Sequence, residues 1–469
     1  KVEFRRVFLT VEEGVCALFG GDLLGKSSVE VKGKKCTALE YTQKTIIPTY
    51  LFALAAGDIA YKKMSDRCGV YAEPPLIDKS AEEFIDAELF IKTAEDYLDY
   101  KYVWGDYNIL VLPPAFPYGG MENPQLTFLN PSLVVGDKSL VATLAHEIAH
   151  SWTGNLVTNK DWNNFWINEG FTVFLERKIV SKIKGPDFFL LESDVGYSAL
   201  NYAIKLLGEK NSYTSLCPCL KGEDPDDAFS KVPYEKGFNL LYYIESILGE
   251  ELFREILRKY IKKYAYKSIS NNEFKGVLYQ EIESAYTSKE EQDKIKEKIN
   301  YDGWINNAGY LPVTPDFSNN SLSKAAISLL SKIEEAKEYN DQTVEEHKKI
   351  FLGFDAKAKV VFINLLLSKE KGVPKEMYEH IVKITQLNLG EKNPEIAYIW
   401  YQFALKNVDH RCYDNAMNFL KSNGRMKYVK PIFIEFNKAA KDLCREFFNE
   451  NKNLYHPSAI RLLENILSK

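Results

Sequence analysis

The sequence predicts an α+β fold, with strands at the beginning, a mixed central region and an all-helical end. Three observations lead to this class. Residues 1–60 are rich in β-branched and aromatic residues with partial alternation, residues 61–308 mix short apolar runs with helical spacing, and residues 322–469 show helical spacing almost throughout. Between the last two regions, residues 309–321 are rich in Pro, Asn and Ser, which is typical of a linker.

The first region holds three candidate strands. VEFRRVFLTV, TALEYTQKTI and YLFALAAGDIAY combine β-branched and aromatic residues with glycine punctuation, so strands are expected up to about residue 75. From Ser80 the pattern changes, because AEEFIDAELFIKTAEDYLDYKY has helical spacing with polar residues between the apolar ones. The mixed region therefore begins with a helix.

The centre is expected to alternate between the two kinds of element. NILVLPPAFPYGGMENPQLTFLN predicts a short buried strand, a Pro/Gly turn and a second extended run. SLVATLAHEIAHSWTGN and NNFWINEGFTVFLERKIVSKI each predict a helix, and a mostly helical stretch follows to about residue 300. After the linker, helical segments of about ten to fifteen residues carry Leu, Ile and Phe stripes, which predicts stacked helix pairs. No fixed repeat period is visible there.

Composition narrows the class of protein. Hydrophobic residues make up 45% and charged residues 27%, as in soluble globular proteins. The net charge of −5 argues against nucleic acid as a partner, and no apolar run approaches the ~20 residues that cross a bilayer, so no membrane partner is expected. Seven scattered cysteines suit reduced thiols in the cytoplasm. The chain opens KVEFRRVFLT without Met, so a fragment or processed form is expected.

The stretch HEIAHSWTGNLVTNKDWNNFWINEG predicts a zinc site. Residues four apart share a helix face, so His146 and His150 can present two imidazole nitrogens to one cation, and the apolar stripe of that helix lies elsewhere. Catalytic zinc takes three protein ligands and keeps a position for water. Glu169 on the next helix is the candidate third ligand, which makes one Zn²⁺ per chain the expected cofactor.

The neighbouring carboxylates have different expected roles. Glu147 follows the first histidine, where the H-E-x-x-H pattern places a general base that reaches the water rather than the metal. Glu176 shares a helix face with Glu169 and is a candidate acceptor for an imidazole N–H. The alternative is an ordinary helix with structural histidines, since H-E-x-x-H also occurs by chance. The Asn-Glu-Gly spacing favours zinc.

Two further clusters have simple alternatives. In YGGMENP the paired glycines suggest a backbone that approaches a ligand closely, and Glu122 could bind a substrate cation, whereas a plain turn is the simpler interpretation. In VPYEKGF the hydroxyl of Tyr234 could donate to a developing oxyanion, whereas packing is the commoner role of a tyrosine. The residues alone leave both alternatives open.

Taken together, GGMEN, H-E-x-x-H, N-E-G and YEKG resemble the gluzincin zinc aminopeptidases, and GRMK at 424–427 resembles their leukotriene-A(4) hydrolase branch. The resemblance runs from about residue 40 to the end. It implies that residues 1–60 are the final part of an N-terminal β-domain, residues 61–308 a thermolysin-like catalytic domain and residues 322–469 an all-helical domain. It also implies that a glutamine beside the zinc comes from chain before Lys1.

The resemblance assigns roles to individual residues. His146, His150 and Glu169 would bind zinc, Glu147 would be the general base and Tyr234 would stabilise the tetrahedral intermediate. The substrate would be bound by Tyr118, Gly119, Gly120, Met121, Glu122, Asp226, Arg425 and Lys427. Within that set, Glu122 would hold the peptide's α-amine, Arg425 and Lys427 its carboxylate, and Asp226 would favour a basic first side chain and serve epoxide hydrolysis.

These roles imply a metallo-exopeptidase that removes basic or small N-terminal residues from short peptides. A second activity is implied by Asp226 and Arg425, namely hydrolysis of a fatty-acid epoxide such as leukotriene A(4). Phe229 occupies the position where that branch has a tyrosine that lines the epoxide pocket, so the expectation of the second activity is weaker. Two alternatives stay open: an enzyme that is mainly a lipid epoxide hydrolase, and a catalytically silent scaffold whose helical end binds a partner.

Overall fold

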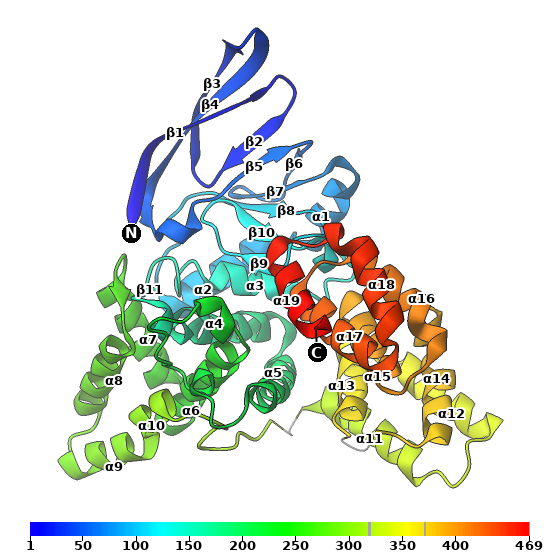
Figure 1. Cartoon of the computed structure of the whole chain (residues 1–469). Coiled ribbons are helices and arrows are strands. Elements are labelled where there is room, and N and C mark those ends of the chain that lie inside the picture. The colour runs from blue at the N-terminus through cyan, green and yellow to red at the C-terminus, as the bar shows by residue number, and fades with distance from the viewer. Residues whose placement is uncertain (318–319, 370–371, 469) are drawn as a thin grey trace. The chain divides into compact units, whose positions relative to one another are not determined.

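The computed structural model describes residues 1–317, 320–369 and 372–468 (Figure 1). The chain divides into two compact units that interleave along the sequence. Unit 1 comprises Lys1–Leu110, Met121–Phe128 and Ala142–Phe317, and unit 2 comprises Val111–Gly120, Leu129–Val141 and the chain from 318 onward. The predicted linker, 309–321, spans this change of unit, and its residues 318–319 lie outside the described residues.

The start of unit 1 is built from strands, as predicted. Strand β4 is the centre of an antiparallel sheet in the order β1-β4-β3, and β2 pairs with β5 antiparallel (blue in Figure 1). Leu39 and Tyr41 of β4 pack with Ala17 and Phe19 of β2 to form a small core. The bounds of these strands are β1 Val2–Glu12, β2 Cys16–Phe19, β3 Asp22–Val31, β4 Lys34–Ile47 and β5 Leu54–Gly57.

A second sheet follows in the order β6-β7-β8-β10-β9, with β6 antiparallel and β8 parallel to β7. The predicted buried strand is β8, whose residues Ile109 and Leu110 are inaccessible to solvent. The helix predicted from Ser80 is divided in two, because the backbone turns at residues 84–86. The bounds are β6 Ala60–Lys63, β7 Cys68–Ala72, α1 Ile77–Glu83, α2 Ala87–Leu98, β8 Tyr107–Val111, β9 Gly120–Met121 and β10 Thr127–Leu129.

Two helices carry the predicted zinc residues. Helix α3 (Ala142–Ala149) is shorter than the stretch predicted for it, and it ends before Trp152. Helix α4 (Trp166–Lys184) is buried along most of its length, since its aromatic and aliphatic side chains pack on several neighbours. Gly170 of α4 faces Gly237, and a Cβ on either would lie 2.8 Å from the Cα of the other. The two glycines therefore allow α4 and the helix that starts at Gly237 to approach closely.

The rest of unit 1 is mostly helical, as predicted up to about residue 300. Strands β11 and β12 form a short parallel pair that ties the segment after α3 to the segment before α8. The bounds are β11 Thr158–Asn159, α5 Pro186–Leu207, a π-helical turn Val232–Lys236, α6 Gly237–Leu248, α7 Glu250–Tyr264, β12 Ser268–Ile269, α8 Asn271–Ala285, α9 Lys289–Ile299 and α10 Tyr301–Asn306.

Unit 2 contains the stacked helices predicted for the end of the chain (yellow to red in Figure 1). Each helix of the series α11, α13, α15, α17 and α19 packs on the next member of that series, and α12 packs on α14. The bounds are α11 Ser321–Glu335, α12 Asp341–Leu352, α13 Ala356–Leu367, α14 Lys375–Thr385, α15 Pro394–Lys406, α16 Tyr413–Ser422, α17 Met426–Ala439, α18 Lys441–Asn451 and α19 Pro457–Leu467.

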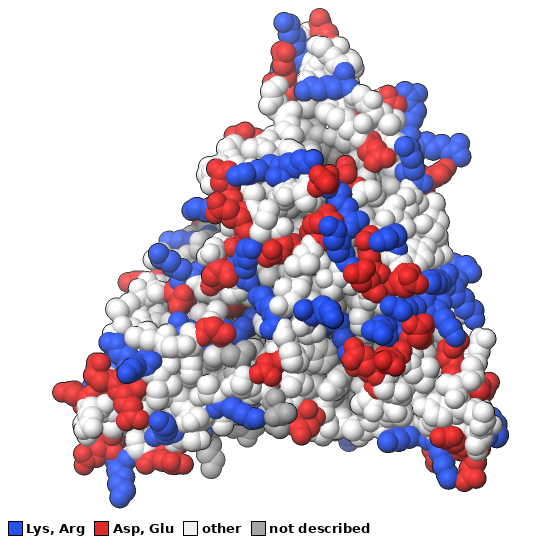
Figure 2. Space-filling view, turned by 180° about the vertical axis from the view of Figure 1, so that it is seen from behind, with Lys and Arg blue, Asp and Glu red and all other residues white. Residues whose placement is uncertain are grey.

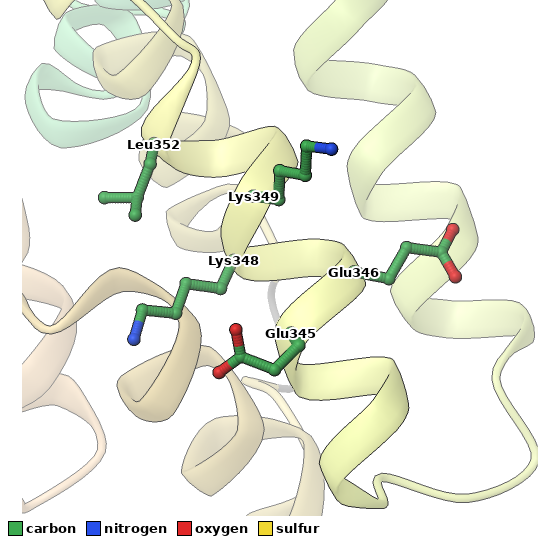
Figure 3. A pocket seen from close by; sticks show the side chains of 5 residues that line it. All are labelled: Glu345, Glu346, Lys348, Lys349 and Leu352. Atoms are coloured by element: carbon green, nitrogen blue, oxygen red, sulfur yellow. The ribbon is translucent and has the colours of Figure 1, made fainter.

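The surface carries charges of both signs. Figure 2 shows basic and acidic side chains interspersed over the face it displays. On α12 a hollow of about 500 Å³ is lined by four charged residues and Leu352. Glu345 and Lys348 extend to one side of the helix, and Glu346 and Lys349 extend to the other (Figure 3). Their charged groups do not converge on one point. In the described part of the chain, no helix is long and apolar enough to cross a membrane.

Candidate metal centre and active site

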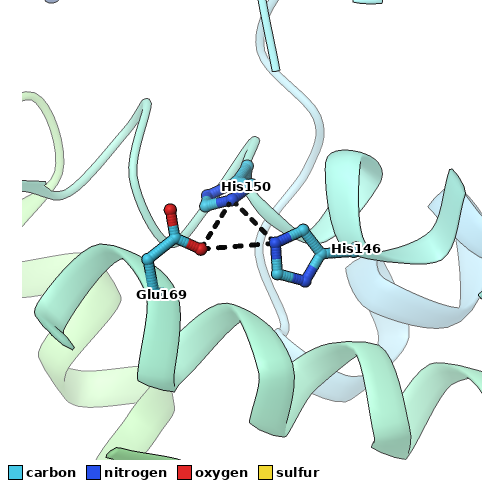
Figure 4. A group of neighbouring side chains, drawn as sticks. All are labelled: His146, His150 and Glu169. Carbon is cyan, nitrogen blue, oxygen red and sulfur yellow. Dashed lines mark hydrogen bonds and ion pairs between the residues drawn. The ribbon is translucent and has the colours of Figure 1, made fainter. Parts of the chain in front are cut away.

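The predicted zinc ligands lie together in unit 1. His150 is the first residue after α3, but its N–H donates to the His146 carbonyl at 3.1 Å, so the helical turn continues. The Nε2 atoms of the two histidines are 3.2 Å apart. Oε2 of Glu169, in the first turn of α4, lies 3.3 Å from one Nε2 and 3.5 Å from the other. Figure 4 shows these three atoms facing a common point. We call His146, His150 and Glu169 the zinc triad.

The donor chemistry of the zinc triad fits a metal. Nδ1 of His146 lies 2.9 Å from Glu176 Oε2, and Nδ1 of His150 lies 2.9 Å from the Thr153 carbonyl, so both Nδ1 atoms carry the proton. In a neutral histidine each Nε2 then presents a lone pair. Two such nitrogens and a carboxylate oxygen in mutual contact are a donor set that fits a cation between them. Oε2 of Glu169 is buried and, among the described residues, has no hydrogen-bond partner.

The separations also agree with zinc. Two ligand atoms at about 2.0–2.1 Å from zinc, seen at the tetrahedral angle, lie roughly 3.3–3.4 Å from each other. The separations within the zinc triad run from 3.2 to 3.5 Å. The residues present therefore match a tetrahedral zinc site with one position left for water or substrate.

The zinc triad is electrostatically coupled. Burial alone would raise the pKa of Glu169, but His150 and His146 hold it at about 2. Burial alone would lower the pKa of His150, but Glu122 and Glu169 raise it to about 9. The Glu169 and Glu176 carboxylates likewise overcome the burial of His146 and raise its pKa well above 6.5. The site thus stabilises positive charge at this point.

The predicted base and the predicted amine-binding residue adjoin the zinc triad. Glu122, Glu147 and His150 each offer one ligand-type atom, and these atoms lie within 4.8 Å of one another. Glu122 is buried, and its backbone carbonyl accepts from the Asn155 side chain at 2.8 Å, which ties it to the turn after α3. Burial raises the pKa of Glu147 to about 8, and the Glu122 and Glu169 carboxylates act in the same direction. Such a pKa suits a residue that takes and returns a proton near neutral pH.

The third predicted catalytic group, Tyr234, lies beside the zinc triad. It belongs to the π-helical turn Val232–Lys236, and such turns are frequent at functional sites. Its ring stacks on that of His146 with centroids 6.1 Å apart and planes 23° apart. Desolvation, with the carboxylates of Glu169 and Glu122, raises the pKa of Tyr234 well above 10. The hydroxyl therefore keeps its proton and remains a hydrogen-bond donor.

Comparison with known proteins matches both units. A family model described as Peptidase family M1 domain matches residues 84–300, and one described as Leukotriene A4 hydrolase, C-terminal, matches residues 354–467. Leucine aminopeptidase 2 of Ajellomyces capsulatus is 38% identical over 437 residues, covering 92% of this chain and 68% of that protein. The chain belongs to peptidase family M1. A leukotriene A-4 hydrolase of Xenopus laevis is 38% identical over 421 residues, covering 89% of this chain and 67% of that protein.

The fold of this M1 peptidase also has a solved counterpart. Yeast LTA4 hydrolase in complex with bestatin has a TM-score of 0.86 and 31% identity, covering 99% of this chain and 74% of that chain. The predicted α+β class, with a β-rich start, a catalytic domain and a helical end, is confirmed. The family and the geometry of the zinc triad together make this chain a zinc aminopeptidase, as predicted.

The predicted substrate-binding motif GRMK, residues 424–427, lies in unit 2, where it contacts the segment that ends at Gly120. The N–H groups of Gly424 and Met426 donate to the carbonyls of Pro114 and Pro117, each at 2.8 Å. A Cβ on Gly119 would lie 2.5 Å from an Arg425 nitrogen. The glycine predicted to admit a ligand thus also makes room for the Arg425 guanidinium. Tyr118 is exposed in the same segment, and Gly120 is the first residue of β9.

The cations of GRMK have an internal partner. Nζ of Lys427 lies 2.7 Å from both carboxylate oxygens of Glu395, and Nη1 of Arg425 lies 3.5 Å from one of them. Tyr428 bridges them, since its hydroxyl accepts from Arg425 at 2.7 Å and donates to Glu395 at 2.9 Å. Burial would raise the pKa of Glu395, but Lys427 and Arg425 hold it at about 2. Two cations, Arg425 and Lys427, therefore surround the Glu395 carboxylate.

The structure leaves the role of one predicted residue, Asp226, open, and it places one residue that was not predicted, Tyr50, near the site. Asp226 lies in a 3₁₀ turn, Pro225–Ala228, and is exposed, so its roles in binding a basic first side chain and in epoxide hydrolysis stay predictions. Tyr50 was missed: it is near Glu122 and Glu169, and its hydroxyl accepts from Asn168 at 3.0 Å. The strand in which Tyr50 was expected gave no sign of this position.

Proposed function

We propose that this M1 peptidase removes single residues, basic or small, from the free N-terminus of short peptides. The observation that carries the proposal is the position of Glu122. Its carboxylate lies beside Glu147 and His150 in a buried site, so it offers a negative charge to an ammonium next to the scissile bond. An acetylated N-terminus lacks that charge, and the buried carboxylate would then stay unpaired, which is unfavourable.

The residues around the zinc triad would have separate roles in peptide hydrolysis. Bound zinc supplies a Lewis acid that polarises the carbonyl and lowers the pKa of water. Glu147 takes a proton from the attacking water and returns it to the leaving amine. Tyr234 donates its hydroxyl proton in a hydrogen bond to the developing oxyanion, an interaction typically worth ~10²–10³ in rate. Glu176 orients His146 through the Nδ1 hydrogen bond.

The carboxylate of a short peptide would be bound by Arg425 and Lys427. Arg425 is suited to a carboxylate because a guanidinium can bind both carboxylate oxygens. Lys427 would contribute mainly by fixing Glu395, which it already contacts. Met121, Gly120 and Gly119 would contact the substrate through their backbone. Asp226 would favour a basic first side chain.

The proposal is tested with tripeptides that begin with Arg, Ala or Leu, each free or N-acetylated, on the wild type and Glu122→Gln. We expect the wild type to cut free peptides at least ~10²-fold faster than acetylated ones, because only an ammonium pairs with the carboxylate. Glu122→Gln is expected to lose most of this preference through a higher KM for free peptides. Glu40, which pairs with Arg6 on an exposed strand, provides the control Glu40→Gln. Equal cutting of free and acetylated peptides by the wild type would refute the exopeptidase assignment.

A second activity, hydrolysis of a fatty-acid epoxide such as leukotriene A(4), is favoured by the match of residues 354–467 to the leukotriene A4 hydrolase C-terminal domain. Asp226→Asn is the discriminating variant. We expect it to retain cleavage of Ala-Ala-Ala within ~3-fold while epoxide hydrolysis falls at least ~10-fold, because the uncharged Ala side chain does not pair with the Asp226 carboxylate, whereas the epoxide reaction would use it. Phe229→Tyr is the companion variant. No turnover of leukotriene A(4) by the wild type would remove this second activity.

We further propose a cytoplasmic location and a role in peptide catabolism. Support comes from the cysteines, each of which lies in the described part of the chain and is a free thiol. The proposed domains are residues 1–60, 61–308 and 322–469, with 309–321 as linker. The two family matches fall inside the larger two domains, which supports these bounds. Metal analysis of the purified chain tests the alternative of a catalytically silent scaffold. That alternative would be favoured if no zinc were found.

A further inference from the structure

The residue after Tyr234 is a buried carboxylate with one dedicated partner. Glu235 lies in the π-helical turn, and both of its carboxylate oxygens accept from Nη2 of Arg177 at 2.9 Å. Both side chains are almost completely buried. The mechanism described above uses neither of them. Their contact joins the turn that carries Tyr234 to helix α4.

Helix α4 is the element that the pair connects to the turn. It carries Glu169 of the zinc triad, then Thr172 and Glu176, and Arg177 is the next residue. Glu176 in turn contacts His146. A single rigid helix therefore holds a zinc ligand, the partner of a second ligand, and the cation that contacts the neighbour of Tyr234.

The surroundings leave the pair little freedom to move. The Arg177 guanidinium lies over the Phe238 ring, with Cζ 4.0 Å from its centroid. On α5, a Cβ on Gly196 would overlap with both the Glu235 carboxylate and the Arg177 guanidinium, so the glycine provides the space they occupy. Breaking a buried pair leaves an uncompensated charge and is strongly unfavourable. The distance between α4 and the turn is therefore closely specified.

Lys236, two residues after Tyr234, is held in a different direction. Nζ of Lys236 donates to the carbonyls of Thr214, Asn307 and Gly309, at 2.8–3.0 Å. The turn is thus anchored at two residues that follow Tyr234, and of these two side chains it is Glu235 that contacts the helix that carries Glu169. Lys236 fixes the turn to loops, and Glu235 fixes it to α4.

We propose that Arg177 and Glu235 form a positioning pair, which sets the Tyr234 hydroxyl relative to the zinc triad. The inference rests on the proposed role of Tyr234 as oxyanion donor. The pair touches no substrate, so its effect passes through Tyr234. A displacement of about 1 Å at a reacting centre can cost ~10² in rate, which sets the size of the effect.

The test is a double-mutant cycle on kcat for Ala-Ala-Ala, with Tyr234→Phe, Glu235→Gln and the double variant. We expect Tyr234→Phe to lower kcat ~10²–10³-fold. Glu235→Gln, which keeps the shape and removes the charge, is expected to lower kcat ~10–10²-fold, with KM within ~2-fold and one zinc per chain retained. In the Tyr234→Phe background, Glu235→Gln should cost less than ~2-fold, because the group it positions is already gone.

A matched control separates positioning from general stability. Lys178, the next residue on α4, forms another largely buried pair with Glu245 of α6, at 2.7 Å, and this pair does not include the turn. Glu245→Gln should lower the melting temperature comparably but leave kcat within ~2-fold. Arg177→Lys, which keeps a charge on the partner side, should restore part of the loss seen with Arg177→Met and serves if Glu235→Gln does not fold.

The outcomes are distinct. Additive losses in the cycle, or a wild-type kcat for folded Glu235→Gln or Arg177→Met, would overturn the positioning role while leaving the proposed function intact. An unchanged kcat in Tyr234→Phe would overturn the role of Tyr234 itself, and the positioning inference with it. A loss of zinc in Glu235→Gln would show that the pair acts on the metal site rather than on the tyrosine.

Discussion

Glu147→Gln is expected to lower kcat for free tripeptides ~10²–10⁴-fold while the chain still binds one zinc. The amide has nearly the same shape as the carboxylate, but it cannot accept a proton from water or deliver one to the leaving amine. Glu147 adjoins the zinc triad without belonging to it, since the proposed ligands are His146, His150 and Glu169. Removal of the base should therefore separate chemistry from metal binding.

The measurement combines steady-state kinetics with metal analysis of the same preparation. KM should change by less than ~3-fold, since the base acts in the transition state. A matched control is Glu95→Gln. Glu95 of α2 is another buried carboxylate, and it pairs with Arg67. Loss of this pair should lower stability but leave kcat within ~2-fold. If Glu147→Gln kept more than a tenth of the wild-type kcat, another group would have to be the base.

The second large effect concerns zinc affinity, which should fall by different amounts in two variants of α4, Glu169→Gln and Glu176→Gln. Glu169→Gln removes one of three ligands, so zinc should be lost on dialysis and activity with it. Glu176→Gln removes only the negative charge of the group that accepts from the His146 N–H, and changes of this kind typically weaken metal binding ~10–100-fold. Excess zinc should therefore restore the Glu176 variant close to wild-type kcat and leave the Glu169 variant inactive.

Competition with a chelator of known affinity gives the zinc dissociation constant for each variant. The melting temperature provides an independent readout, because a ligand that binds only the folded state stabilises it by mass action. Thermal stability should fall in the order wild type, Glu176→Gln, Glu169→Gln when zinc is present, and the three should converge when zinc is removed. Equal affinities for all three would mean that zinc is not held by the zinc triad.

The parts of the site that share one helix were predictable from the sequence. His146 and His150 are one turn apart, and Glu176 is two turns from Glu169, so helical periodicity brought each pair to one face. The third ligand and Tyr234 required motif spacing and the resemblance, since nothing local relates α3 to α4 or to the turn at residue 234. The strands of residues 1–60 and the stacked helices at the end followed from periodicity in the same way.

What could not be predicted depends on contacts between distant segments. The carbonyl of Thr153 binds His150 Nδ1, and a main-chain atom leaves no mark on the sequence. Arg177 and Glu235 are 58 positions apart, and neither has a spacing that points to the other. The early end of α3 before Trp152 was also missed, because the apolar stripe continues past the last helical residue.

The contact between Gly170 and Gly237 restricts how this enzyme can change. Each glycine lies close in sequence to a residue of the active site, Glu169 in one case and Tyr234 in the other. When two packed side chains conflict, one can usually be made smaller to accommodate growth of the other. Here both positions already hold the smallest residue, and the atoms that would be struck are main-chain atoms. A larger residue at either position therefore has no compensating substitution at the other. Substitutions that alter the active site must occur at other positions.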